Sequence, residues 1–417
     1  MHGDRAGHDW YRFILSFPPH LVRHYLERFE IGNKQRVLDP FCGTGTTLVE
    51  CKKLGIKSVG VEANQMAYFA SKVKTDWSPD SGQLRRHAER IADACHQELS
   101  SQQLADAPAM MSLTGQPLRA LPQEQARLLI KNSISPVPLH KTLVLLDRMA
   151  SQADRLFEQH ERLALAKALV SSISNLKFGP EVGVGRKKSD AAVIAAWLSQ
   201  LGCIASDLEV LRQLNPAPAM VHHADSRQIG SLLRPNSVDA VITSPPYPNE
   251  KDYSRTTRLE SVLLGFMQDR RDLRSMKQTF IRSNTRGVYV KDSDDEWIAA
   301  FASIQRIADE IEKRRIDMGK TSGFERLYSR VTKLYFGGMA RHLSEMKSVL
   351  RPGARLAYVV GDQASYLRVM IRTGEILVEI AEGLGYEVEG IDLFRTRFAT
   401  TTGEQLREEV VVLRWPG

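Results

Sequence analysis

Residues 36–64 read RVLDPFCGTGTTLVECKKLGIKSVGVEAN, which is a short apolar strand, a glycine-containing turn, a helix and a second strand that ends at Glu62. A strand, a helix and a strand in this order form a βαβ unit, and such units build parallel sheets with helices on their faces. The stretch therefore predicts an α/β fold with a doubly wound, mostly parallel sheet.

The same alternation returns near residue 220 and continues to the end of the chain. Short strands are predicted within AMVHHADSRQI (219–229) and VDAVITSPPY (238–247), each followed by a polar or proline-rich turn. A helix over 334–350 is followed by the strand RLAYVVGD, the helix GEILVEIAEGLGY and the strands VEGIDLF and EEVVVLRW. A short amphipathic helix is expected over 17–29, where apolar residues recur at helical spacing after two prolines.

Two stretches lack this alternation. Residues 71–216 contain helical sequence such as ERLALAKALVSSISNL and almost no strand pattern, which indicates a helical insertion. Residues 251–330 are charged and helical, and they form a second candidate insertion. We therefore expect one sheet domain assembled from residues 1–70, 217–250 and 331–417.

The composition is that of a globular protein with an excess of basic residues. The 57 Lys and Arg outnumber the 49 Asp and Glu and give a net charge of +8, which suits a polyanionic partner without proving one. No run approaches the roughly 18 apolar residues of a membrane span. The cysteines show no CxxC pair and no nearby histidine cluster, so we expect a cytoplasmic protein with no disulfide framework and no metal site; they are Cys42, Cys51, Cys95 and Cys203.

The turn Asp39-Pro-Phe-Cys-Gly43-Thr-Gly45 follows a predicted strand and precedes a helix. Its glycines let the backbone approach a ligand, and the helix N-terminus offers unpaired N–H groups. The turn has neither the Gly-Lys-Ser/Thr of a P-loop nor a GxGxxG pattern.

Two later carboxylates suggest an adenosine-containing ligand. Glu62 ends the second strand, where an acidic residue can hold two ribose hydroxyls. Asp225 follows a later strand and could accept a hydrogen bond from an adenine amino group. For each carboxylate, the alternative is a loop cap or a surface residue.

Thr243-Ser244-Pro245-Pro246-Tyr247 lies at the end of the strand VDAVI. Two prolines stiffen this turn and orient the carbonyls before them, while the tyrosine ring can lie flat against a base. Alone, the motif could be an ordinary proline turn. The turn, Glu62, Asp225 and this loop all fall at carboxyl ends of predicted strands, where open α/β sheets bind ligands.

The sequence thus resembles the amino-methylating DNA methyltransferases, which modify cytosine N4 or adenine N6. The resemblance rests on FPPHLVRHYLERF, DPFCGTGTT, VGVEAN, HHADSRQI and TSPPY, with weaker support from RLAYVVGD and GYEVEGIDLF. It implies the Rossmann-like fold of S-adenosylmethionine-dependent methyltransferases. It also implies that Asp39, Phe41, Gly43, Gly45, Glu62 and Asp225 form the cofactor site, with Phe41 and both glycines along the methionine, Glu62 at the ribose and Asp225 at the adenine.

By the same resemblance, Ser244, Pro245, Pro246 and Tyr247 form the catalytic loop. A serine opens this loop more often in cytosine N4 enzymes, and Asp or Asn more often in adenine enzymes, so cytosine N4 is the favoured target. The cofactor motif precedes the catalytic loop here, whereas many cytosine N4 enzymes of this type have the opposite order. Methylation at cytosine C5 is not expected, because Cys42 lies in the cofactor turn and none of the cysteines follows a proline in a catalytic-looking loop.

The expected partner is double-stranded DNA, with a cognate restriction endonuclease as a possible companion that makes no direct contact. Two runs, 177–188 and 280–291, mix glycine, basic and aromatic residues and could follow phosphates or could be solvated loops. The residues expected to contact DNA are Lys251, Arg255, Arg258, Arg282 and Arg286.

Three alternatives stay open. The same fold and loop could methylate adenine N6. Related proline-proline loops also modify guanine in transfer RNA, so an RNA methyltransferase is the second alternative. The third is a catalytically silent nucleic-acid-binding protein that retains the fold.

Overall fold

The computed structural model describes residues 5–11, 17–107, 117–179, 181–249, 251–399 and 404–417. The chain divides into two compact units, each built from separate stretches of sequence. The sheet unit comprises residues 17–64, 217–252 and 276–417, and the helical unit comprises residues 1–16, 65–216 and 253–275.

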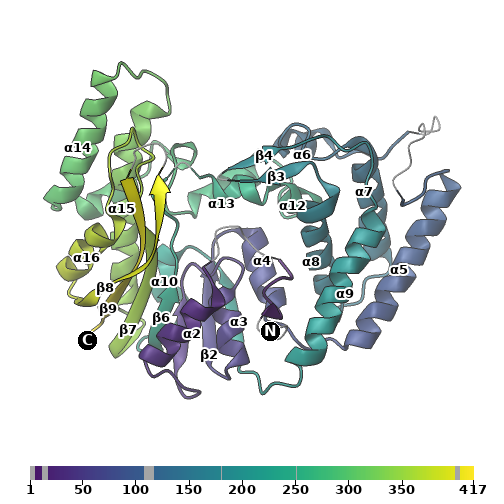
Figure 1. The fold of residues 1–417 in the computed structure, drawn as a ribbon, viewed down its shortest axis with the longest axis horizontal. Helices are drawn as coiled ribbons and strands as arrows, with labels where there is room; N and C mark the ends of the chain where they lie inside the picture. Colours follow the sequence, from purple (N-terminus) through teal and green to yellow (C-terminus); the bar gives the residue numbers. More distant parts are fainter. Residues whose placement is uncertain (1–4, 12–16, 108–116, 180, 250, 400–403) are drawn as a thin grey trace. The chain divides into compact units, whose positions relative to one another are not determined.

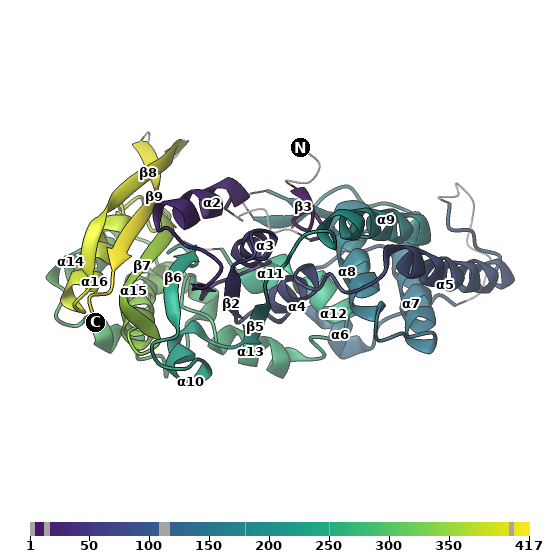
Figure 2. The same cartoon turned by 90° about the horizontal axis from the view of Figure 1, so that it is seen from below.

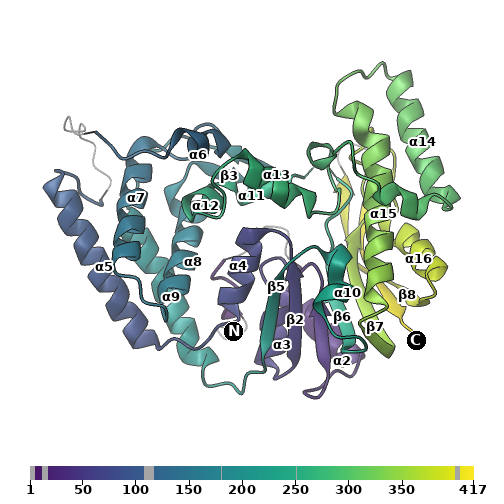
Figure 3. The ribbon, with the colours of Figure 1, turned by 180° about the vertical axis from the view of Figure 1, so that it is seen from behind.

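A seven-stranded sheet organises the sheet unit, with the strand order β5-β2-β1-β6-β7-β9-β8. The strands are β1 (Arg36–Asp39), β2 (Lys57–Glu62), β5 (Ala219–His223), β6 (Val238–Thr243), β7 (Leu350–Gly361), β8 (Glu387–Ala399) and β9 (Glu404–Arg414). The first five strands in this order, from β5 to β7, pair in parallel, and β9 runs antiparallel to both β7 and β8. Strands β5, β2, β6 and β7 can be followed in Figure 3, and Figure 2 shows the long β8–β9 pair. The predicted mostly parallel, doubly wound sheet is confirmed.

Alternate residues of each central strand face opposite layers of helix, as the two-residue period of a strand requires. On β1, Val37 belongs to the apolar cluster with α2 and α3, while Leu38 belongs to the cluster with α15 and α16. On β7, Val359 and Tyr358 divide in the same way. Figure 1 shows α14, α15 and α16 beside β7, β8 and β9. The α-helices described in this unit are α2 (Pro19–Arg28), α3 (Thr46–Lys53), α10 (Ile229–Leu232), α14 (Ala302–Asp317), α15 (Tyr328–Met346) and α16 (Thr373–Gly383).

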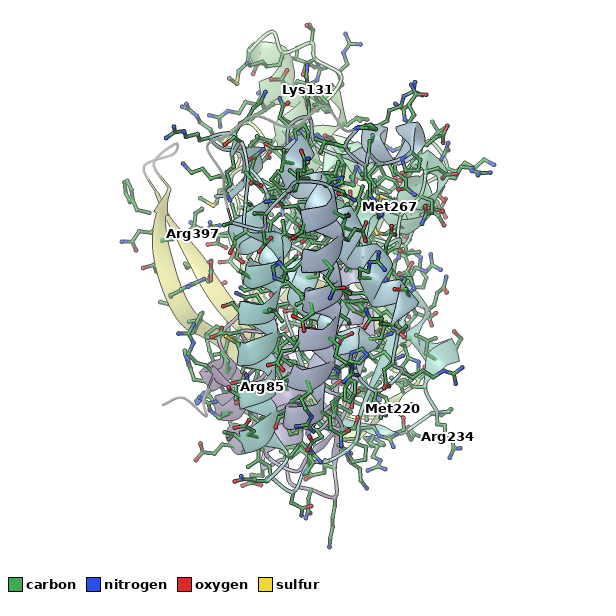
Figure 4. All side chains as sticks on the ribbon, turned by 90° about the vertical axis from the view of Figure 1, so that its right-hand side faces the viewer. Arg85, Lys131, Met220, Arg234, Met267 and Arg397 are labelled. Atoms are coloured by element: carbon green, nitrogen blue, oxygen red, sulfur yellow. The ribbon has the colours of Figure 1, made fainter. Side chains whose placement is uncertain are left out.

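The helical unit buries one large apolar cluster between its long helices. Arg85 of α5, labelled in Figure 4, donates a hydrogen bond of 2.7 Å to the Ser206 hydroxyl of α9. The helices are α4 (Gln65–Lys74), α5 (Ser81–Ser101), α6 (Gln123–Leu128), α7 (Pro136–Ser151), α8 (Glu158–Ala168), α9 (Val193–Leu211), α11 (Tyr253–Thr256) and α12 (Arg258–Leu263), and α13 (Arg270–Gln278) runs from this unit into the sheet unit.

Helix α9 is, among the described residues, the one helix with the length and apolar composition to cross a membrane. Its buried residues include Val193, Trp197, Leu201 and Leu208, which follow helical spacing and join the apolar cluster of the helical unit. This pattern is typical of the core helix of a globular unit.

Residues near the N-terminus and residues 253–275 belong to the same unit as the predicted insertion over 71–216, and hydrogen bonds connect them. The Gly7 N–H and the Trp10 indole both donate to the Asp207 carboxylate on α9, at 2.9 and 2.8 Å. The Tyr11 hydroxyl donates to Glu260 of α12. The segment predicted as one insertion over 251–330 divides between the units after residue 275.

The insertion also contains a small antiparallel pair, β3 (Leu176–Phe178) and β4 (Val182–Val184), where only helical sequence is predicted. These strands have three residues each, too few to show an alternating pattern. They overlap the glycine-rich run 177–188, for which either a contact with DNA phosphates or a solvated loop is expected from sequence.

Candidate active site

The turn between β1 and α3 begins at Asp39, whose side chain is fully buried. Its Oδ1 accepts hydrogen bonds from the Phe41 N–H at 3.2 Å and from the Thr243 hydroxyl at 2.6 Å. Its Oδ2 has no partner among the described residues. Burial raises the pKa of Asp39 to about 6, and the hydrogen bond from the Thr243 hydroxyl opposes this rise. The turn therefore carries a carboxylate that a hydrogen-bond donor could still satisfy.

Both glycines of this turn adopt positive φ, 51° at Gly43 and 84° at Gly45, a conformation that side chains disfavour. Gly45 precedes α3 and brings no side chain to the first turn of the helix. Cys42 is buried, and a Cβ at Gly60 of β2 would lie only 2.8 Å from its Sγ. That close approach supports Cys42 as a small packed residue.

Glu62 ends β2 and is half-buried. Its Oε2 accepts from the Gly43 N–H at 2.8 Å and its Oε1 accepts from the Asn64 N–H at 2.7 Å. Burial raises the pKa of Glu62 to about 7, opposed by the N–H groups of Asn64 and Gly43. A carboxylate has about four acceptor sites, so each oxygen can still accept a hydroxyl. Glu62 thus both holds the turn and remains able to bind a diol.

Asp225 follows β5 and caps the short helix that begins at Ser226, accepting from the Arg227 N–H at 2.9 Å. The Arg227 guanidinium also pairs with its carboxylate at 2.6 Å and with Asp294, and Arg341 pairs with Asp294 at 3.3 Å. Asp225 therefore has the loop-cap role that was the alternative to a ligand contact. The adenine contact stays a prediction, and it would share the carboxylate with Arg227.

The loop Ser244 to Tyr247 directly follows β6, with Ser244 and Tyr247 half-buried and Pro245 buried. The Tyr247 ring packs against the backbone of Gly361 at the end of β7, because a Cβ there would lie 3.1 Å from the ring Cε2. Strands β6 and β7 pair in parallel, with Thr243 opposite Tyr358, so both segments leave the same edge of the sheet. Ser244 and Tyr247 therefore lie at the edge of the sheet where β6 and β7 end.

Thr243 joins the two predicted sites. Its hydroxyl bonds Asp39 at the start of the cofactor turn, while its own backbone leads into Ser244. Sequence reasoning missed this residue, although a hydroxyl side chain just before the loop is the visible signal. It also missed Gly361, whose only signal is a glycine that ends an apolar strand.

The residues expected to contact DNA have different surroundings. Arg282 is buried, and all five of its N–H donors bond inward, to Asp292 and to the carbonyls of residues 277, 278 and 280. Arg258 donates to Ser254 and to the Leu128 carbonyl. Lys251 and Arg255 are half-buried, whereas Arg286 is exposed, with its guanidinium 5.7 Å from the Phe324 ring centre. Arg282 therefore supports its own loop, while a phosphate contact by the exposed Arg286 stays a prediction.

No group of three or more His, Cys, Asp or Glu side chains that could hold a metal ion occurs within the described ranges.

A family model described as DNA methylase, for enzymes acting on N6 or N4 amino groups, matches residues 6–72, which include β1, the glycine turn and β2. Type II methyltransferase M.BsoBI of Geobacillus stearothermophilus is 25% identical over 440 residues, covering 98% of this chain and 84% of that protein. Type II methyltransferase M.AvaI of Anabaena variabilis is 24% identical over 452 residues, covering 98% and 86%. Type II methyltransferase M.MjaII of Methanocaldococcus jannaschii is 41% identical over 68 residues, covering 16% and 12%.

Among solved structures, that of TrmN from Thermus thermophilus aligns with 99% of this chain and 53% of its own, at 11% identity and a TM-score of 0.27. A similarity of this size carries no argument about function.

Proposed function

We propose that this chain is an amino-methylating DNA methyltransferase that transfers a methyl group from S-adenosylmethionine to the N4 amino group of cytosine within a specific sequence of double-stranded DNA. The observation that carries the proposal is the Thr243 to Asp39 hydrogen bond, because it places the Ser-Pro-Pro-Tyr loop beside the glycine turn. The serine that opens this loop favours cytosine over adenine, by resemblance to the family.

The glycine turn fits the cofactor. The unpartnered Asp39 Oδ2 suits a ligand N–H donor, the two glycines leave room for close backbone approach, and Glu62 has acceptor sites left for two ribose hydroxyls. S-adenosylmethionine, when bound, supplies an electrophilic methyl group on a sulfonium.

The catalytic loop prepares the amino group for attack. The lone pair of an exocyclic cytosine amine is delocalised into the ring, so the amine is a weak nucleophile. Hydrogen bonds from its two N–H groups to the Ser244 hydroxyl and the Pro245 carbonyl favour a tetrahedral nitrogen with an available lone pair. In-line attack by this amine would form the nitrogen–carbon bond as the bond between the methyl group and the sulfonium sulfur breaks and the thioether leaves. The methylated nitrogen would then lose a proton to solvent, with positioning and electrostatics supplying the rate enhancement.

Tyr247 holds the target base. A base inside a duplex cannot reach the loop, so it must leave the stack at a cost of a few kcal/mol. Stacking on the Tyr247 ring offsets part of that cost, and Gly361 supports the ring from the sheet side. The exposed Arg286 contacts the phosphate backbone. A cognate restriction endonuclease with the same target sequence is the companion enzyme that the Type II relatives suggest.

Adenine N6 is the second candidate target, because the matching family model covers both amino groups. Nucleoside mass spectrometry of DNA from cells that express the chain decides between them. N4-methylcytosine supports the proposal, and N6-methyladenine in its place overturns the choice of base. A methyl group found in RNA and not in DNA would indicate an RNA methyltransferase, and cofactor binding without any transfer would indicate a silent binding protein.

Single-molecule sequencing of the same DNA locates the modified base within its sequence. Modification confined to one short motif supports a site-specific enzyme. Modification spread over unrelated sequences contradicts it.

A further inference from the structure

His342 lies on α15, fully buried, and touches two separate segments that the cofactor site needs. Its ring meets the Phe41 ring edge-on, with centroids 4.8 Å apart and an interplanar angle of 62°. Its Nδ1 lies 3.1 Å from the Ser226 carbonyl oxygen, one residue beyond Asp225. One side chain therefore contacts both the turn after β1 and the turn after β5.

The hydrogen bonds of His342 define its protonation. A carbonyl oxygen only accepts, so Nδ1 carries the proton and donates to Ser226. Nε2 then accepts from the Tyr358 hydroxyl on β7, at 2.8 Å. Burial lowers the pKa of His342 to about 4, so the neutral form required by this pattern is present at neutral pH. Both nitrogens are satisfied, which fixes the ring in one orientation.

Strand β2 already ties each turn to the sheet. On one side the Gly43 N–H donates to the Glu62 carboxylate, and on the other the Ala224 N–H donates to the Glu62 carbonyl. His342 adds a direct link between the two turns that does not pass through β2. Strand β2 lies between β1 and β5 in the sheet, so the turns do not follow adjacent strands. Phe41 is half-buried, and its ring packs against the His342 ring. A shift of His342 would therefore move Phe41 and the Ser226 turn relative to each other.

We propose that His342 is a positioning residue for S-adenosylmethionine, holding the methionine end and the adenine end of the site at the separation that the cofactor requires. The inference rests on the proposed function, because it takes Phe41 and Asp225 as cofactor contacts. His342 itself touches neither the cofactor nor the target base.

Three substitutions separate the contacts. His342→Phe keeps an aromatic ring against Phe41 but leaves the Ser226 carbonyl and the Tyr358 hydroxyl unpaired. His342→Asn restores a donor toward Ser226, and Tyr358→Phe removes only the bond to Nε2. Removing one partner of a buried hydrogen bond commonly changes an equilibrium constant about tenfold. His342→Phe should therefore raise the Kd for S-adenosylmethionine roughly tenfold. His342→Asn should recover part of that loss, and Tyr358→Phe should cost less than about threefold.

His160→Phe is the matched control. His160 is also fully buried. Its Nε2 lies 2.9 Å from the Asp76 carbonyl oxygen, and its ring packs edge-on against Trp10, all within the helical unit. It should lower the melting temperature to a similar extent and leave cofactor affinity unchanged.

The full-length chain is titrated with S-adenosylmethionine in a calorimeter, and DNA affinity is measured separately. The proposal holds if His342→Phe weakens cofactor binding alone and His342→Asn partly restores it. It is overturned if His342→Phe binds the cofactor as the parent chain does, or if its cofactor affinity and DNA affinity fall together. A control His160→Phe that loses cofactor affinity as much as His342→Phe does also overturns it. If His342→Phe does not fold, His342→Asn decides: a measurably weaker cofactor affinity than that of the parent chain supports the proposal, and an affinity equal to that of the parent overturns it. A parent chain that binds no cofactor at all would instead overturn the proposed function, and the positioning role with it.

Discussion

The Tyr247 ring packs so closely against Gly361 that a methyl group added at Gly361 would disturb the catalytic loop. In Gly361→Ala the new Cβ would lie 3.1 Å from Cε2 and 3.5 Å from Cδ2 of the tyrosine ring. The Glu408 Cγ lies 3.4 Å away from the same position, so the Cβ has no free space to move into. The tyrosine ring must therefore shift by a few tenths of an ångström away from the sheet.

The shift has a size that can be estimated. Overpacking by one methyl group costs about 1–3 kcal/mol, and stacking of a base on an aromatic ring is worth roughly the same. If the stacked geometry loses about 1.4 kcal/mol in the transition state, turnover falls about tenfold. The cofactor site is not contacted by the new methyl group, so the Kd for S-adenosylmethionine should change by less than about twofold.

Methyl transfer to duplex DNA is measured by radiolabel incorporation, and cofactor binding is measured by calorimetry. Gly323→Ala is the control, because Gly323 is exposed and a Cβ there meets nothing within 4 Å. Turnover equal to that of the parent chain in Gly361→Ala would refute the idea that the contact with Gly361 positions the Tyr247 ring. An equal loss of cofactor affinity would instead indicate general damage to the sheet edge.

Four further predictions test other parts of the site. Tyr247→Ala should leave cofactor affinity nearly intact and reduce turnover about ten- to hundredfold, as lost stacking predicts; near-normal methylation would make the loop a structural turn. Gly43→Asp should abolish cofactor binding in calorimetry, because its side chain would fill the ligand space and strain a positive φ; unchanged affinity would remove the turn from the site. Arg286→Gln should reduce the salt slope of DNA binding by about one, while Arg282→Gln should chiefly destabilise the fold; an unaltered slope for Arg286→Gln would make that loop merely solvated. Since burial raises the pKa of Glu62 to about 7, the chain without cofactor should lose stability relative to Glu62→Gln as pH rises from about 4.5 to 7, measured by denaturant titration; the opposite trend would contradict the burial argument.

The raised pKa of Glu62 fixes the direction of that last effect. A carboxyl group whose pKa is higher in the folded state than in the unfolded chain binds its proton more tightly when folded. Its contribution is therefore fully present below the unfolded value and is lost as pH rises through about 7. Glutamine does not titrate, so the difference between the two proteins isolates this residue.

The elements of the sheet were readable from sequence because their signals are local. The alternation that assigns Val37 and Leu38 to opposite faces is present within four residues of β1. The glycines of the turn before α3 and the prolines of the loop after β6 restrict their own backbone, so their positions in the chain were enough to locate both motifs. The short pair β3 and β4 escaped detection because three residues carry no period.

The sequence by itself thus determined the order of strands and helices, the glycine turn, the acidic end of β2 and the proline loop, since each depends on neighbours within a few positions. Only the tertiary structure decided that Thr243 bonds Asp39 across 204 positions of sequence, and that His342 links Phe41 to the turn at Ser226. It also decided that Arg282 turns inward while Arg286, four residues later, faces solvent. The physical reason is that burial and hydrogen-bond partners belong to the packed chain: a guanidinium or a hydroxyl has the same chemistry everywhere, and its role depends on which distant groups the fold brings within about 3 Å.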